Sequence, residues 1–400
     1  MEEQLWEACA AGNVEEVIKL LQNEQININW QDSEYSRTPL LRACGWGHIE
    51  IVKLLLNDKR VDINKANKNE ATPFYIACEF GHIDIVKILL NDERIDVNQA
   101  EKNSWTPFHV ACYFGHIEIM KLLLNDNRVD FNNANKNDAT PLFIACEKGH
   151  IEIVKLLLND QRIDPNKANK NGASPFYIAC ENGHFEIVRI LLNDNRIDVN
   201  KAKNGATSFY VVCPSWTPFL IACEKGHIEI VKLLLSDHRV DINKAEKNGA
   251  TPFYIACEKG NLEIVKLLLN DERVDINKSM NSGWTPFFIA CQEGHIDIVR
   301  LLLNDNRINL NKADNGGWTP FFIACEDGRI DIVKLLLNDE RVDINKENKN
   351  GVTPFYIACQ EGHVEIVLLL LKTSRGNFSF NQRRKNPNKK KKSRPKHQVE

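Results

Sequence analysis

The amino-acid sequence predicts an all-α solenoid of about eleven helix-turn-helix repeats, each followed by a projecting hairpin or loop, here called a finger. Thr-Pro pairs, with one Ser-Pro, recur along the chain, and eight of the nine intervals between them are 34 residues. Each repeat holds two apolar segments too short to be stable helices alone, so neighbouring repeats must cover one another. The pairs begin at Thr38, Thr72, Thr106, Thr140, Ser174, Thr217, Thr251, Thr285, Thr319 and Thr353, and an initial helix pair lies at about residues 2–23.

The repeat at residues 72–105 shows how the first helix forms. Thr72 is a favourable N-cap, because its side-chain oxygen accepts a backbone N–H, and Pro73 suits the first helical position. Gly81 is expected to end this helix. Its apolar face has i, i+3 and i+4 spacing, at Phe74, Ala77 and Cys78.

A second helix is expected from about residue 83 to residue 90 of the same repeat. Asp84 and Lys87 should face water, and Asn91 with Asp92 should stop the helix. The polar segment DVNQAEKNS then forms the finger. The residues predicted to be buried are Ile85, Val86 and Leu89.

The twelve cysteines share one position of the repeat, and no C-x-x-C pair occurs. A fixed position beside an Ala or Val is typical of a small buried residue, so we expect reduced thiols and neither disulfides nor a metal site. In the full repeats each cysteine follows the Thr or Ser of its pair by six residues. The twelve are Cys9, Cys44, Cys78, Cys112, Cys146, Cys180, Cys213, Cys223, Cys257, Cys291, Cys325 and Cys359.

The frame T-P-[F/L]-x-x-A-C-x-x-G-H, followed by EIVKLLL and VDIN, resembles the ankyrin repeat up to about residue 372. Ankyrin repeats usually have 33 residues and tetratricopeptide repeats 34, but no repeat here carries the Trp, Leu-Gly, Tyr and Pro pattern of the latter. The resemblance implies an ankyrin-type solenoid at residues 1–372. Residues 373–400 are expected to form a separate basic tail.

The extra residue per repeat can be assigned to the turn after the second helix. Ankyrin repeats usually turn there through a Gly, whereas this chain has N-D-x-R-[V/I]-D. Because Asn tolerates the left-handed conformation better than most residues, we expect a longer turn built on Asn. These residues are Asn57, Asn91, Asn125, Asn159, Asn193, Asn270, Asn304 and Asn338, with Ser236 as the exception.

The one irregular interval, 43 residues, lies at GATSFYVVCPSWTPFLIAC, residues 205–223. A first copy, GATSFYVVC, is followed by a second, SWTPFLIAC, and only the second continues into another helix. We interpret residues 205–215 as an insertion, a truncated repeat or a gene-prediction error. In the protein they should lengthen the finger between the sixth and seventh repeats and weaken the stack there.

No catalytic constellation is recognisable, so we expect no enzyme activity, no cofactor and no small-molecule substrate. The sequence has no Gly-rich phosphate loop, no G-x-S-x-G and no H-E-x-x-H. Eight histidines follow the Gly between the two helices, which favours a repeated hydrogen-bonding role over metal ligation. They are His48, His82, His116, His150, His184, His227, His295 and His363.

Charge separates the tail from the array. Residues 372–400 carry 11 Lys/Arg and one acid, a net charge of +10, whereas residues 1–371 carry 40 and 53, a net charge of −13. The segment at residues 383–398 lacks apolar side chains and is expected to be disordered. It fits a nuclear-import signal read by an import receptor, a nonspecific contact with nucleic acid or anionic lipid, or a solvated tail. Its basic residues are Arg383, Arg384, Lys385, Lys389, Lys390, Lys391, Lys392, Arg394 and Lys396.

The resemblance implies a non-catalytic scaffold or adaptor that binds a partner protein through its fingers and concave face. The alternatives are a nuclear adaptor whose tail contacts nucleic acid or anionic lipid, and a fragment of a larger ankyrin-containing protein. The longest apolar run, six residues, is too short to span a membrane, and no secretory signal is readable. We therefore expect a monomer in the cytoplasm, the nucleus or both.

One position that varies among the repeats is the best candidate for partner binding. The residue before the Gly of Gly-His is aromatic in the second to fourth repeats and polar in later ones, as at Lys148. Because Trp and Tyr are favoured anchors, we expect the main binding patch on these repeats and a weaker second site further along. The alternative is that the rings only pack on neighbouring turns. The candidates are Trp46, Phe80, Trp105, Tyr113 and Phe114, then Trp284 and Trp318.

Overall fold

The computed structural model describes residues 1–203, 206–207, 211–212 and 215–373. They belong to two compact bodies, an N-terminal body of Met1–Pro252 and a C-terminal body that begins at Phe253. Within the described residues there are 22 helices and one pair of short strands. The predicted basic signal at residues 383–396 and Cys213 lie outside the described residues.

The N-terminal body holds seven helix pairs, one pair for each of the first seven repeats. Their bounds are α1 (Glu2–Ala11), α2 (Val14–Leu21), α3 (Pro39–Trp46), α4 (Ile49–Asn57), α5 (Pro73–Glu79), α6 (Ile83–Leu90), α7 (Pro107–Phe114), α8 (Ile117–Leu124), α9 (Pro141–Lys148), α10 (Ile151–Leu158), α11 (Pro175–Glu181), α12 (Phe185–Leu192), α13 (Pro218–Lys225) and α14 (Ile228–Ser236). Strands β1 (Ala206–Thr207) and β2 (Val211–Val212) lie between α12 and α13.

The C-terminal body holds the last four helix pairs. Their bounds are α15 (Pro252–Lys259), α16 (Leu262–Leu269), α17 (Pro286–Glu293), α18 (Ile296–Leu303), α19 (Pro320–Glu326), α20 (Ile330–Leu337), α21 (Pro354–Glu361) and α22 (Val364–Lys372). None of the helices described here is both long enough and apolar enough to cross a bilayer.

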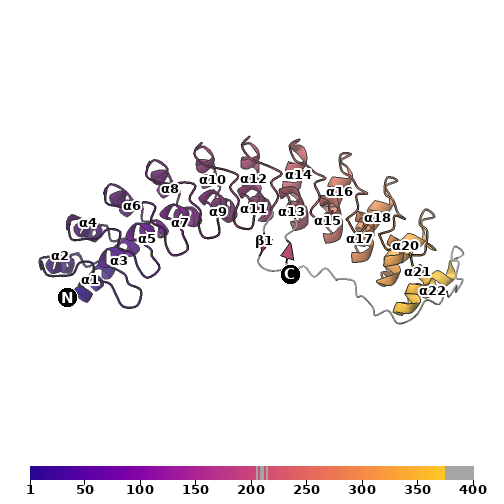
Figure 1. Ribbon diagram of the computed structural model, residues 1–400, viewed down its shortest axis with the longest axis horizontal. Helices are drawn as coiled ribbons and strands as arrows, with labels where there is room; N and C mark the ends of the chain where they lie inside the picture. The colour runs from indigo at the N-terminus through magenta and orange to yellow at the C-terminus, as the bar shows by residue number, and fades with distance from the viewer. Residues whose placement is uncertain (204–205, 208–210, 213–214, 374–400) are drawn as a thin grey trace. The chain divides into compact units, whose positions relative to one another are not determined.

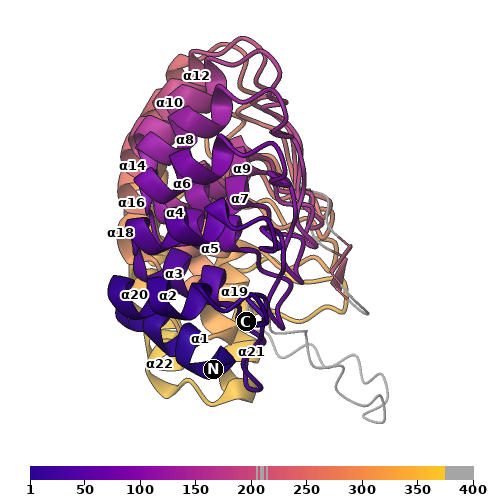
Figure 2. The ribbon, with the colours of Figure 1, turned by 90° about the vertical axis from the view of Figure 1, so that its left-hand side faces the viewer.

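Each body is a two-layered stack of helices. The first helices of successive repeats pack side by side, and the second helices form a layer behind them. In the N-terminal body the first helix of each repeat lies on the inner side of the curve that this body traces (Figure 1). These helices are α1, α3, α5, α7, α9, α11 and α13. Its fingers project from one side of the helices (Figure 2). The inner helices and fingers together form the surface on which a partner was predicted to bind.

The first helices begin and end as predicted. The Oγ1 atom of Thr72 accepts the backbone N–H of Tyr75 at 3.1 Å, and Pro73 is the first residue of α5. Gly81 follows the helix with a φ of 74°, the left-handed conformation that glycine adopts at little cost. This N-cap residue is also buried, since Thr72 is 0% exposed. Local capping therefore sets the length of the inner helices that begin with Thr-Pro or Ser-Pro, such as α5.

The predicted core is confirmed. Ile85, Val86 and Leu89 are buried, whereas Asp84 and Lys87 are exposed. All described cysteines are free thiols, and all except Cys359 are buried. Burial raises the pKa of the Cys9 thiol to about 12 and raises the pKa of the other buried thiols as well. These side chains therefore stay protonated and act as small apolar residues.

The prediction of a left-handed Asn after the second helix is wrong. Asn91 has a φ of −75° and a ψ of −10°, and the equivalent residues in the other repeats are right-handed too. The Asp and Arg that follow fix this turn instead. Asp126 accepts the backbone N–H of Arg128 at 2.9 Å and its guanidinium at 2.6 Å. This hydrogen-bonded guanidinium holds the pKa of Asp126 below its ordinary value.

The same arginine joins consecutive repeats. The Nη2 atom of Arg128 donates to the carbonyl oxygen of Leu90, at the end of the second helix of the preceding repeat, at 2.8 Å. The contact recurs between Arg196 and Leu158 at 2.7 Å. Carbonyl groups at a helix end lack partners within the helix, and here the next repeat supplies one. The extra residue per repeat thus serves an Asp-Arg cap in place of a glycine turn.

The nine extra residues before the seventh repeat lie inside a finger. An ordinary finger closes through a hydrogen bond such as Asn135 N–H to Ala139 O, 3.1 Å, across four residues. In the irregular finger the N–H of Lys203 donates to the carbonyl oxygen of Trp216 at 2.9 Å, and β1 pairs with β2 in antiparallel register above this closure. The insertion therefore lies between Lys203 and Trp216, which still form the hydrogen bond that closes an ordinary finger.

The stacking contacts continue across this finger. His227 Nε2 lies 3.0 Å from the carbonyl oxygen of Glu181, and Arg239 donates to the carbonyl oxygen of Leu192 at 2.6 Å. Both match the contacts between other repeats. The described contacts therefore do not show the weakening of the stack that was predicted there.

Candidate protein-binding surface

A ladder of histidines fixes the inner surface. The Nε2 atom of His116 lies 2.9 Å from the carbonyl oxygen of Glu79 in the preceding repeat, and its ring covers Gly81. The predicted repeated hydrogen-bonding role of these histidines is confirmed. The further Gly and His pairs are Gly12 with His48, Gly47 with His82, Gly115 with His150, Gly149 with His184, Gly183 with His227, Gly260 with His295 and Gly328 with His363.

Three exposed rings lie on neighbouring inner helices. Trp46 ends α3, Phe80 follows α5 directly, and Phe114 ends α7, with exposed fractions of 60%, 58% and 49%. Phe80 stacks on His82 at 6.3 Å between ring centres, and Phe114 stacks on His116 at 6.1 Å. Since α3, α5 and α7 pack in order, the three rings form a row that faces solvent, in which histidines of the ladder support Phe80 and Phe114.

Trp105 and Tyr113 support the third ring. Tyr113 contacts Phe114 edge to face at 5.0 Å, and Trp105 contacts Tyr113 in the same way at 5.3 Å. Both side chains are half-buried. The Nζ atom of Lys148, from the next repeat, lies 4.4 Å from the centre of the Tyr113 ring. Trp105, Tyr113 and Phe114 therefore form one continuous aromatic cluster.

Trp284 and Trp318 are placed differently, in two fingers of the C-terminal body. Trp284 stacks on Phe288 at 5.6 Å and donates from its indole nitrogen to Asp314 at 3.1 Å. Trp318 lies against Phe322 at 6.5 Å. Both indoles are half-buried and pack on the first helix of the repeat that follows. They offer less free apolar surface than the rings of the second to fourth repeats.

Sequence reasoning missed a cluster of aromatic and cationic side chains beside Trp46. Trp6, on α1, donates from its indole nitrogen to the carbonyl oxygen of Arg37 at 2.9 Å. The guanidinium of Arg42 lies over the Trp6 ring at 4.5 Å and over Trp46 at 5.6 Å. Arg37 lies over Tyr35 at 4.4 Å. The available signal was Arg42 itself, which stands where the other Thr/Ser-Pro repeats have Ile or Val.

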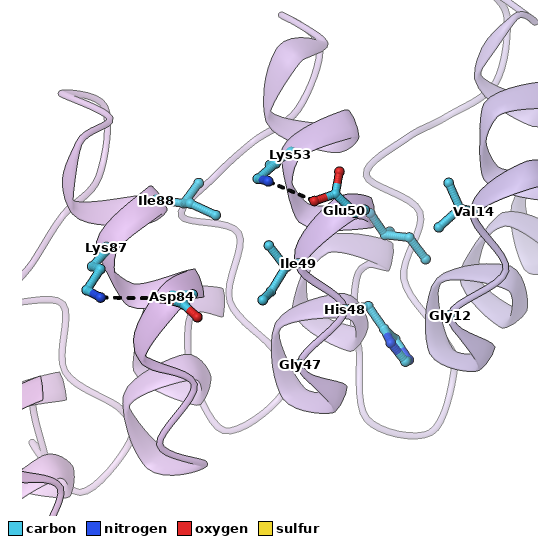
Figure 3. A pocket seen from close by; sticks show the side chains of 11 residues that line it. Gly12, Val14, Gly47, His48, Ile49, Glu50, Lys53, Asp84, Lys87 and Ile88 are labelled. Atoms are coloured by element: carbon cyan, nitrogen blue, oxygen red, sulfur yellow. Dashed lines mark hydrogen bonds and ion pairs between the residues drawn. The ribbon is translucent and has the colours of Figure 1, made fainter. Parts of the chain in front are cut away.

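The outer side of the first three repeats has a hollow of about 700 Å³ (Figure 3). Two ion pairs lie at its edge, Lys53 with Glu50 at 2.7 Å and Lys87 with Asp84 at 3.3 Å. Equivalent ion pairs recur along the array, as at Lys121 and Glu118, so these pairs do not mark the hollow as a special site. Nowhere in the described ranges do three His, Cys, Asp or Glu side chains gather in a way that could hold a metal ion.

Helix pairs stacked through a cross-repeat ladder, with fingers on one side, define a tandem-repeat solenoid. A family model described as ankyrin repeats, three copies, matches nearly the whole chain, and the protein belongs to the ankyrin repeat family. Ankyrin repeats are in general protein-protein interaction scaffolds and are generally non-enzymatic. Among curated proteins, none matches this chain. The matched segments are residues 5–101, 59–135, 94–169, 126–203, 160–246, 202–280, 219–314, 272–348 and 306–384.

Proposed function

We propose that this protein is a scaffold or adaptor that binds a partner protein on the inner surface of repeats two to four. The observation that carries the proposal is the row of Trp46, Phe80 and Phe114, three rings at one repeat position that remain about half exposed or more. Later repeats place Lys, Asn, Asp or Glu at this position, so the shared packing does not require a ring there.

The physical case rests on apolar surface that the fold leaves in water. Full burial of a large apolar side chain is worth about 1.5–3 kcal/mol of free energy, and much of the surface of these three rings is still exposed and can be buried by a partner. Aromatic side chains held in place by their own repeat also lose little conformational entropy on binding. Trp46, Phe80 and Phe114 thus have the exposure and rigidity expected of binding anchors.

The proposal is tested with the triple variant Trp46→Ala/Phe80→Lys/Phe114→Lys. Lys is native at this position in the fifth, seventh and eighth repeats, so the variant should keep its helix content and thermal midpoint. We expect its affinity for partners recovered by pull-down and identified by mass spectrometry to fall about a hundredfold or more, since each lost anchor costs about 1–2 kcal/mol.

The matched control removes polar side chains from the same position of later repeats, as Lys225→Ala/Glu293→Ala/Glu361→Ala. This control should keep the partners that bind the wild-type protein. If the folded triple variant retains every partner, the rings have only a packing role and the assignment is wrong.

We also propose that the basic cluster at residues 383–396, which lies outside the described residues, directs the protein to the nucleus through an import receptor. The contrast between a tail of +10 and an array of −13 supports a separate role for it. No aromatic residue lies within the cluster, which disfavours single-stranded nucleic acid as its target.

A fluorescent fusion lacking residues 383–398 is expected to lose its nuclear signal. A variant with Lys389 to Lys392 changed to Gln should behave in the same way, because it removes charge and keeps the chain length. The row of rings is the control, since the triple variant should localise as the wild type does. An unchanged distribution of the truncated fusion contradicts the import role.

A further inference from the structure

We propose that Arg42 binds a carboxylate of the partner, so that the segment recognised by repeats two to four carries an Asp or Glu among apolar residues. This inference rests on the proposed function, because it assigns partner chemistry to the same surface. It is carried by an arginine that replaces a core residue and forms no ion pair within the described part of the chain.

The sequence of the second repeat departs from the others on one helix face. Position 42 is Ile or Val in the other nine Thr/Ser-Pro repeats, and Ile144 and Ile221 show that this position is ordinarily buried, each 2% exposed. Three residues later stands Gly45, where the other repeats have Glu, Gln or Tyr. With Trp46, these residues occupy positions i, i+3 and i+4 of α3 and share one face. The second repeat has therefore gained a cation and lost the neighbouring side chain.

Arg42 forms no ion pair among the residues that the structure describes, and the nearby Asp32 carboxylate, which acts on its charge, is paired with Arg37. The Nε–H of Arg42 is covered by protein and meets no hydrogen-bond acceptor there. The neighbouring guanidinium of Arg37 is paired, with Nη2 3.0 Å from Asp32 Oδ2. A partly buried cation without an anion is destabilising, and it binds an incoming carboxylate with little further loss of hydration. The pairing of Arg37 leaves Arg42 as the available cation of the cluster.

Two indoles hold the guanidinium in place. Its carbon atom lies 4.5 Å from the centre of the Trp6 ring and 5.6 Å from that of Trp46, distances at which a cation is attracted to an aromatic face. Trp6 is fixed in turn by its hydrogen bond to the carbonyl oxygen of Arg37. A guanidinium oriented in this way can donate two parallel hydrogen bonds from its terminal nitrogens to one carboxylate.

The position of Arg42 also sets the direction in which a segment binds. Trp46 belongs both to the row of rings and to the Arg42 cluster. When apolar side chains of the partner segment bind the row, the adjacent partner residue therefore lies at the Arg42 guanidinium. The next repeat carries Glu79, three residues after its core Ile76, and burial raises the pKa of this carboxyl group. An acidic partner residue is therefore favoured at the Arg42 end of the row and disfavoured beside Glu79.

The experiment selects random twelve-residue peptides, displayed on phage, on the full-length protein and counter-selects them on Trp46→Ala/Phe80→Lys/Phe114→Lys. Enriched peptides are expected to carry Asp or Glu next to apolar residues. The tightest peptide and its amide counterpart, with Asp→Asn or Glu→Gln, are then titrated by fluorescence anisotropy against the wild type, Arg42→Ile and Arg42→Lys. Ile or Val is the residue of the other repeats at this position, so Arg42→Ile should fold, as circular dichroism checks.

We expect Arg42→Ile to weaken the acidic peptide about tenfold or more, and Arg42→Lys to weaken it less. The amide peptide should bind the wild type about tenfold more weakly and bind Arg42→Ile as the acidic peptide does, which is the signature of a direct pair. Three outcomes overturn this inference and leave the proposed function standing. The peptides that need the three rings have no acidic residue, they carry basic residues instead, or they bind Arg42→Ile as tightly as the wild type. If no peptide prefers the wild type to the triple variant, both fall.

Discussion

Acid is expected to destabilise the fourth repeat through His109, and Phe at this position should remove the effect. His109 is 0% exposed and lies where other repeats have Tyr, Phe or Leu. Its Nδ1 atom accepts the backbone N–H of Thr106 at 3.2 Å, and its Nε2 atom lies 3.2 Å from the carbonyl oxygen of Ala139. A ring whose Nδ1 accepts a backbone N–H is neutral, with its proton on Nε2.

Burial lowers the pKa of His109 to about 4, against the opposing effects of the Ala139 and Asn133 carbonyl groups and the Asp130 carboxylate. In the unfolded chain an ordinary His titrates near pH 6.5, so between these values the unfolded state binds more protons. Stability is therefore present above about pH 6.5 and falls as the pH drops toward 4, by up to about 3 kcal/mol in total.

The measurement is the urea midpoint of unfolding of wild type and His109→Phe at pH 7.5, 6.5, 5.5 and 4.5. Phe143, Phe288 and Phe322 occupy this position in other repeats, so the replacement fits the fold. Other groups also respond to acid, since the paired aspartates such as Asp126 have lowered pKa values, but they are common to both proteins. The difference between the two midpoints should shift in favour of the variant as the pH falls. A difference that does not change with pH refutes this role of His109.

The elements that local chemistry determines could be predicted from the sequence. Thr72, Pro73 and Gly81 set the first helix by an N-cap, a fixed φ and a left-handed turn, all of which act within a few residues. The period of 34 residues gave the number of repeats and placed the cysteines in the core. The exposed row of Trp46, Phe80 and Phe114 followed from the same period, since a position that varies within near-identical repeats is not fixed by packing.

Contacts between repeats could not be predicted in the same way. Propensity alone predicts a left-handed Asn91, whereas an arginine of the next repeat caps the helix that precedes this turn, since Arg128 donates to the carbonyl oxygen of Leu90. Such a contact joins residues 38 positions apart, and propensity carries no information on that scale. The role of Arg42 could not be predicted for a related reason, because the Arg42 guanidinium packs on the ring of Trp6 in the repeat before it.

A large loss of stability is expected from Gly81→Ala. Gly81 has a φ of +74°, where a side chain costs about 1–2 kcal/mol. A Cβ atom there would also lie 2.7 Å from Cε1 of His116, closer than these atoms can approach. The His116 ring would have to turn away and give up its hydrogen bond to the carbonyl oxygen of Glu79, which contributes about 1 kcal/mol.

The two costs can be separated within one repeat pair. Gly81→Ala should destabilise the third and fourth repeats by about 2–4 kcal/mol in the wild-type background, but only by the backbone cost of about 1–2 kcal/mol in a His116→Ala background, where the ring is gone. Hydrogen exchange of the α5 to α8 amides is the measurement, because neighbouring repeats of an array can open separately. Gly362→Ala is the matched control, since Gly362 has a φ of +80° and no atom within 4 Å of the added Cβ. Equal costs with and without His116 would show that the histidine ladder does not couple the repeats, and the row of rings would then need another support.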